Sequence, residues 1–339
     1  MNITDFVIGY EEFKIRYLAA STNVESATDF WNTYNQDPIG LLNNRQFLLL
    51  RDRLFHLLIA CRNINADAFI NIHKGHPYYF IGISSYLLDD YQTAIYYLDA
   101  AVTEDMNSGA DPMNSPRPST RFLMLEGETT DQAARPITKI AQAKVERVLR
   151  YYHNSVNKDS VITELTIEDL RNYFICYSLR KINGEPGLRT LVTSFITFCT
   201  EWDFRKDHFE SGVSKGTAEP FYLHLFRGCI LFESLLKHNP KVKPSKDTLV
   251  KILKEQKIID ELKITAITGG SYTLNDVFNE LKQYDNSIYS AIKITCMARN
   301  TLGHTLGWNE NITQSQYHDL YYIIASSCLH ILACLWRTA

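Results

Sequence analysis

The sequence predicts an all-α protein, because apolar residues recur at helical spacing along most of its 339 residues. Alternation of apolar and polar residues, which is typical of strands, is scarce. The hydrophobic content of 45% permits a sizeable core, and the charged content of 22% is not that of a disordered chain. The length suggests two or three domains. The net charge of −3 gives no global attraction to nucleic acid.

The first predicted domain covers residues 1–106. It contains a helix at 44–62 and a pair of helices at 77–88 and 91–103, broken at Asp89-Asp90. The pair resembles a tetratricopeptide repeat at Tyr78, Ile81, Gly82, Ala94, Leu98 and Ala101. The resemblance implies an interaction region for a protein or nucleotide regulator. A stable array needs about three repeats and only one is visible, so a helical hairpin that matches the pattern by chance stays an alternative.

The residues that follow predict a loop and then more helices. Residues 107–130 are rich in proline and read as a linker. The middle region, 131–210, carries no motif and predicts a helical scaffold with helices at 131–153, 166–182 and 187–209, preceded by the capping candidates Thr130, Thr166 and Glu185. Beyond a second loop at 211–220, helices are predicted at 221–238, 246–263, 273–284, 286–302 and 313–337, with a short hairpin at 263–274 as an open alternative.

Cysteine usage and hydropathy predict a cytoplasmic protein. None of the seven cysteines forms a CxxC pair and most lie in apolar helical stretches, so we expect reduced, buried thiols. The N-terminal residues lack the pattern of a secretion signal. The most apolar stretch, 321–336, is shorter than the roughly 20 residues of a membrane span. We therefore expect a buried helix and no membrane partner.

The stretch MARNTLGHTLGW, 297–308, contains the strongest candidate site. Arg299 continues an apolar helical face and needs a partner there, Asn300 follows it, and His304 stands five residues away. One interpretation is a helix C-terminus, with Gly303 as its cap and both basic residues favoured by the helix dipole. Five residues turn a regular helix by about 140°, so Arg299 and His304 converge only if the helix ends or bends at Gly303.

RNTLGH resembles the R-x4–6-H motif of the HEPN superfamily, in which a polar residue often follows the arginine. The segment 221–238 with Glu233 resembles that family's first long helix, and 313–337 its last. The HEPN-like domain is accordingly placed at 218–339.

The resemblance implies a metal-independent endoribonuclease without a cofactor, acting as a homodimer in which two copies of the motif form a composite site. A ribose 2′-hydroxyl attacks the adjacent phosphate. His304 serves as base or acid, Arg299 stabilises the phosphorane oxygens, and Asn300 supports them. Glu233 and His318 are supporting candidates. Such domains act as toxins or in defence against phage, and that role comes from the resemblance alone.

The segment 237–257 is rich in lysine and predicts contacts to RNA phosphates. The candidate residues are Lys241, Lys243, Lys246, Lys251 and Lys254. The alternative is an ordinary solvated face. For the whole chain, the alternative function is a non-catalytic helical scaffold or interaction protein that dimerises or binds nucleotides.

Other enzyme classes are disfavoured by missing motifs. The chain has no GxxxxGK[ST] phosphate loop, no GxGxxG after a strand and no GxSxG elbow. His73 and His76 lack a cysteine or carboxylate at ligand spacing, so no metal site is predicted.

Overall fold

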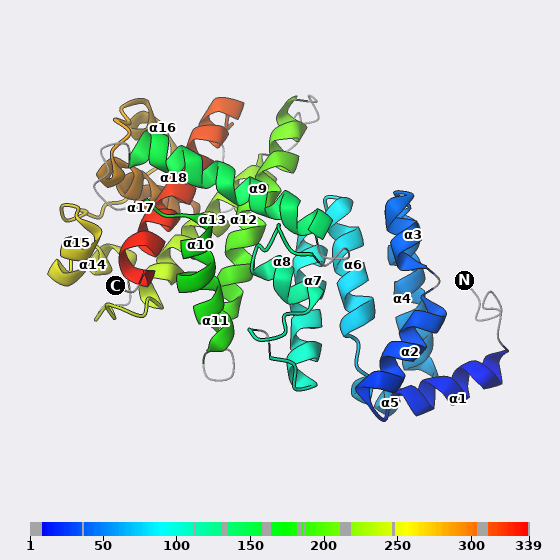
Figure 1. Ribbon diagram of the computed structural model, residues 1–339. Coiled ribbons are helices and arrows are strands. Elements are labelled where there is room, and N and C mark those ends of the chain that lie inside the picture. Colours follow the sequence, from blue (N-terminus) through cyan, green and yellow to red (C-terminus); the bar gives the residue numbers. More distant parts are fainter. Residues whose placement is uncertain are drawn as a thin grey trace. The chain divides into compact units, whose positions relative to one another are not determined.

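The computed structural model describes residues 9–35, 37–111, 113–130, 135–157, 164–181, 185, 187–210, 218–245, 248–303 and 311–337. Every regular element in these ranges is helical (Figure 1), which confirms the all-α prediction. The chain forms two compact units, Met1–Ile140 and Ala141–Ala339, called here the first and second units.

The first unit consists of helices joined by short connections. In chain order they are α1 (Tyr10–Ala20), α2 (Val24–Tyr34), α3 (Pro38–Asn43), α4 (Phe47–Ile64), α5 (Ala66–Asn71), α6 (Gly75–Leu87), α7 (Tyr91–Asn107) and α8 (Pro118–Leu123). Aromatic side chains join α1 to α2, with Phe13 against Phe30 and Tyr34. Such pairs add to the apolar area that the two helices bury.

The pair α6 and α7 is the hairpin predicted from the sequence. Asp89 ends the first helix in a left-handed conformation (φ 60°), and the Asp90 side chain caps the second by accepting from the Thr93 amide. A Cβ at Gly82 would lie 2.6 Å from Cγ of Leu98. The close approach of the two helices therefore depends on glycine at this position.

The loop predicted at 107–130 is wrong for residues 118–123, which form α8. Pro118 at its first turn presets the helical φ angle. Phe122, Leu123 and Leu125 are fully buried, so this segment belongs to the core of the first unit. The proline content of this segment thus comes partly from Pro118, which begins a helix.

Helix α9 (Arg135–Tyr151) runs across the boundary between the units, and the remaining helices belong to the second unit. The α-helices are α10 (Ile167–Asp169), α11 (Cys176–Arg180), α12 (Gly187–Glu210), α13 (Glu219–Lys237), α14 (Leu249–Ile252), α15 (Gln256–Leu262), α16 (Leu274–Lys282), α17 (Ile288–Leu302) and α18 (Gln314–Ile331). Three π-helical segments, Tyr152–Val156, Leu170–Ile175 and Leu332–Trp336, continue α9, α10 and α18. Residues 141–210 of the predicted middle region thus fold with the C-terminal part.

Local boundaries in the second unit agree with several predictions and correct others. Thr166 caps its helix in a reciprocal box with Asp169, as predicted. The helix predicted at 246–263 is two short helices, α14 and α15. In the described residues 263–274 there is no strand, so the hairpin alternative is wrong.

The core of the second unit lies where α12, α13, α17 and α18 pack together. Gly228 of α13 is the tightest point, because a Cβ there would lie 2.4 Å from Cζ of Phe198 and 2.8 Å from Cγ2 of Ile324. His330 is also buried here. Its Nε2 donates to the Leu262 carbonyl (2.8 Å), its Nδ1 accepts from the Tyr152 hydroxyl (3.0 Å), and burial lowers its pKa to about 4.

Among the described helices, Gln314–Trp336 alone is long and apolar enough to cross a membrane, with a mean hydropathy of 1.4. About 94% of that window is buried inside the protein, which is the behaviour of a core helix. All seven cysteines are buried and none forms a disulfide, as the sequence predicts.

Candidate functional site

Arg299 lies in the last turn of α17, one turn beyond the buried Thr295 and Cys296. Its Nε donates to Oε2 of Glu233 on α13 at 2.6 Å. The side chains are 29% and 8% exposed, respectively, so the carboxylate is nearly buried and the guanidinium is partly so. This ion pair supplies the partner that an arginine on an apolar face requires.

Glu233 also holds a second cation. Nζ of Lys237 lies 2.8 Å from the other carboxylate oxygen, Oε1. One carboxylate thus fixes two positive side chains, which leaves this group with a net charge of +1. In the described part of the chain, Arg299 pairs with no residue other than Glu233. Its terminal nitrogens remain available to an anion.

These residues form one wall of a cavity of about 550 Å³. Asn300 lines it beside Arg299, and further lining residues come from α14 and the segment before α16. The lining residues are Glu233, Lys237, Thr248, Leu249, Val250, Gly270, Ser271, Tyr272, Arg299 and Asn300. The Thr301 hydroxyl lies 2.9 Å from the Met297 carbonyl oxygen and 3.2 Å from the Tyr272 carbonyl oxygen, next to this segment. A guanidinium, an ammonium and an amide on one wall suit a phosphate group.

His304 lies outside the described residues, which end at Gly303 on this side. Gly303 follows the last residue of α17 with a right-handed φ of −83°, so it is not a left-handed cap. A Cβ there would lie 3.0 Å from the Arg299 carbonyl oxygen and 3.2 Å from Cε2 of Phe226. A side chain at this position would therefore make tight contacts on both sides. Helix α17 ends at Leu302.

The lysines predicted to contact RNA do not line this cavity in the part of the chain that the structure describes. Lys241 pairs with Glu261 at 2.5 Å, Lys243 accepts through its backbone carbonyl from Lys257, and Lys251 and Lys254 are exposed. Lys246 lies outside the described residues.

The lysine that does line the cavity, Lys237, is the first residue of the lysine-rich segment 237–257 that was predicted to contact RNA phosphates. It stands four residues after Glu233 on one helix, a spacing that brings the two side chains together.

His318 lies on α18 and packs against aromatic rings rather than the cavity. Its ring centroid is 5.5 Å from that of Trp202 and 4.9 Å from that of Tyr322. Burial, together with the charges of Lys206 and Arg147, lowers its pKa. Glu233 is therefore the one of the two supporting candidates that contacts Arg299.

The described residues include no group of three or more His, Cys, Asp or Glu side chains placed to hold a metal ion. The candidate site consists instead of a carboxylate that positions two cations at a cavity. Comparisons with protein-family models, with curated proteins and with solved structures find no match.

Proposed function

We propose that the second unit is a metal-independent endoribonuclease that works as a homodimer. Two features support this proposal. One is the sequence Arg299-Asn300-x3-His304, which resembles the HEPN ribonuclease motif. The other, which carries most weight, is the cavity wall on which Glu233 fixes Arg299 and Lys237 with an excess of positive charge.

The proposed reaction needs an anion site and an acid–base group. The ribose 2′-oxygen forms a bond to phosphorus and the bond from phosphorus to the 5′-oxygen breaks, which leaves a 2′,3′-cyclic phosphate and a 5′-hydroxyl. Arg299 stabilises the charge that develops on the phosphorane oxygens. His304 takes the 2′-hydroxyl proton or protonates the leaving 5′-oxygen, since imidazole titrates near neutral pH. Asn300 orients the phosphate.

Dimerisation is part of the proposal because we assign the acid and base roles to two histidines, one from each protomer. Each protomer contributes one Arg299 and one His304, and the two motifs face each other across the twofold axis. A role as a toxin or in defence against phage belongs to the proposal by resemblance alone.

The test is cleavage of a labelled single-stranded RNA in EDTA by the purified chain. We expect products with 2′,3′-cyclic phosphate ends and a loss of at least about 100-fold in rate for His304→Ala, the usual lower range for an acid–base group. Lys237→Gln should weaken RNA binding more than it lowers turnover. The matched control is His238→Ala, because His238 is an exposed histidine at the end of α13.

Equal cleavage by the His304→Ala and wild-type proteins refutes the assignment. Saturable binding of RNA or nucleotides without any cleavage product supports the second candidate, a non-catalytic interaction protein. For this second candidate, the cations that line the cavity indicate only that it binds phosphate groups. Sedimentation in the same buffer decides whether a dimer forms.

A further inference from the structure

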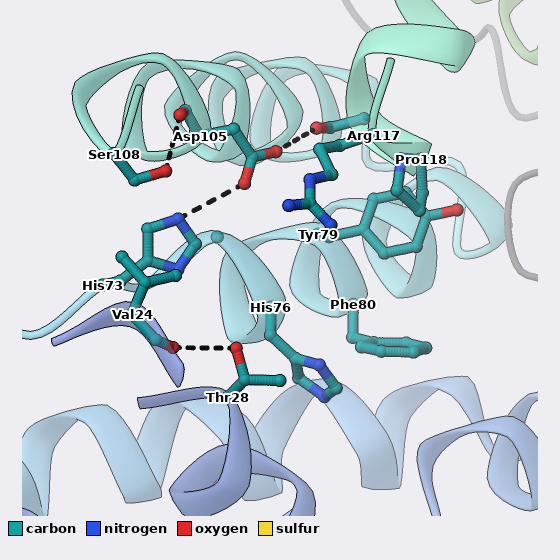
Figure 2. Close-up of a pocket in the computed structure, with 12 residues that line it drawn as sticks. Val24, Thr28, His73, His76, Tyr79, Phe80, Asp105, Ser108, Arg117 and Pro118 are labelled. Atoms are coloured by element: carbon teal, nitrogen blue, oxygen red, sulfur yellow. Dashed lines mark hydrogen bonds and ion pairs between the residues drawn. The ribbon is translucent and has the colours of Figure 1, made fainter. Parts of the chain in front are cut away.

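The first unit contains its own cavity, of about 300 Å³, between α2, α6, α7 and α8 (Figure 2). This volume lies at the lower end of the range for small-molecule sites. The lining residues are Val24, Thr28, His73, Gly75, His76, Tyr79, Phe80, Asp105, Ser108, Arg117, Pro118 and Ser119. None of them belongs to the candidate site of the second unit.

One side of this cavity is polar and held in place. Nε2 of His73 lies 3.3 Å from Oδ1 of Asp105, and the Ser119 hydroxyl donates to Oδ2 at 3.3 Å. Oδ2 of Asp105 thus accepts a hydrogen bond, and Oδ1 faces the imidazole of His73. Gly75 makes room for the pair, since a Cβ there would lie 2.6 Å from Cε1 of His73 and 2.8 Å from Oδ1 of Asp105.

Arg117, an exposed residue, adds a positive charge to the lining of the cavity. Figure 2 shows the guanidinium of Arg117 pointing into the space between His73 and Tyr79. In the part of the chain that the structure describes, this guanidinium makes no ion pair or hydrogen bond. Burial and the neighbouring His73 lower the pKa of His76 to about 4, so His76 is neutral at pH 7. The N-terminal end of α6 lies at the same cavity and adds a partial positive charge.

The other side of the cavity is apolar. Tyr79 and Phe80 present their rings, and Val24 and Pro118 complete the wall. Tyr79 and Phe80 are 5% exposed, so their positions are fixed by packing within the unit. A ligand that fits therefore combines one anionic group with a compact apolar body.

We infer that the first unit binds a small organic acid, with its carboxylate on Arg117 and its aromatic or branched apolar body against Tyr79 and Phe80. A planar carboxylate matches the two parallel donors of a guanidinium. The inference stands apart from the proposed ribonuclease function, because its residues and its charge come from the first unit alone.

The test is isothermal titration of the full chain with phenylacetate, indole-3-acetate and 4-methylpentanoate. Phenylacetamide, acetate and inorganic phosphate serve as probes that lack the charge or the apolar body. We expect at least one of the three acids to bind about tenfold or more tightly than all three comparison probes, which corresponds to about 1.4 kcal/mol.

Arg117→Gln should remove this preference for the charged probe and leave the weak binding of phenylacetamide unchanged. The matched control is Arg62→Gln, which removes an exposed guanidinium from α4 away from the cavity. The inference is overturned if none of the acids binds saturably at millimolar concentration. It is also overturned if amide or phosphate binds as tightly as the acids, or if Arg117→Gln behaves like Arg62→Gln.

Discussion

Replacing Glu233 by glutamine tests the arrangement on which the candidate site depends. The amide has the shape of the carboxylate but no charge, so Arg299 and Lys237 lose the anion that holds them at 2.6 and 2.8 Å. The carboxylate is 8% exposed, and water replaces its contacts poorly. We expect the variant to fold and to be less stable.

The expected loss follows from two opposing terms. Each ion pair is attractive by about 4 kcal/mol at an effective dielectric constant of about 20. The desolvation of a nearly buried carboxylate offsets most of that attraction. Arg299 and Lys237 are 29% and 35% exposed, so both regain part of their hydration in the variant. The net loss for a charged, part-buried hydrogen bond is about 1–3 kcal/mol.

Thermal and urea unfolding measure this loss. A loss of about 2 kcal/mol lowers the midpoint by about 4–8 °C in a unit of this size. The control is Glu280→Gln, which breaks the more exposed pair with Lys293 (2.6 Å; 24% and 32% exposed) and should cost about 0–1 kcal/mol. If Glu233→Gln costs no more than Glu280→Gln, the reasoning about the buried carboxylate is wrong. Combining Glu233→Gln with Arg299→Met should cost less than the sum of the single changes.

Three further predictions concern the second unit. Gly228→Ala should destabilise the unit by about 1–3 kcal/mol, because overpacking exceeds the helix-propensity gain of about 0.5–1 kcal/mol. The control Gly187→Ala should not destabilise it, since no atom lies within 4 Å of the added Cβ. Equal effects of the two changes in urea unfolding would contradict the packing at Gly228. Thr273→Ala removes the capping box of α16 and should cost about 1 kcal/mol in the same assay, and an unchanged midpoint would exclude the cap. An unfolded histidine binds a proton below about pH 6.5, whereas folded His330 does so only near pH 4, so stability should fall as pH falls through this window. His330→Gln should flatten that decline in melting temperature between pH 7 and 4, and an unchanged slope would refute the role of His330.

Helical periodicity predicted most elements of the fold because most of these helices bury one face. The break at Asp89-Asp90 was visible because two acidic residues interrupt an apolar pattern. The short helix α8 was missed because its prolines and serines read as a loop, although Phe122 and Leu123 are buried. The division of 246–263 into α14 and α15 was missed because the apolar residues on both sides of the turn keep one spacing.

The candidate site was predictable only in part. Arg299 and Glu233 are 66 positions apart, and only the packing of α17 on α13 joins them. The sequence marked each as a polar residue on an apolar face, but not that they are partners. His318 is likewise a polar residue on a long apolar helix, and its face of α18 turns toward Trp202. The first-unit cavity was missed because Asp105 lies 32 positions from His73, outside any local spacing rule.

The distribution of the buried cysteines lets thiol labelling distinguish the unfolding of the two units. Cys61 is the cysteine of the first unit, and the other six lie in the second. Burial raises the pKa of Cys61, Cys199, Cys229, Cys296, Cys328 and Cys334, to about 12 for Cys199, so the folded protein should react slowly with thiol reagents. Opening of the first unit then adds the mass of one adduct, and opening of the second adds six. Intact-mass spectra of partly labelled protein can therefore tell in which order the two units open.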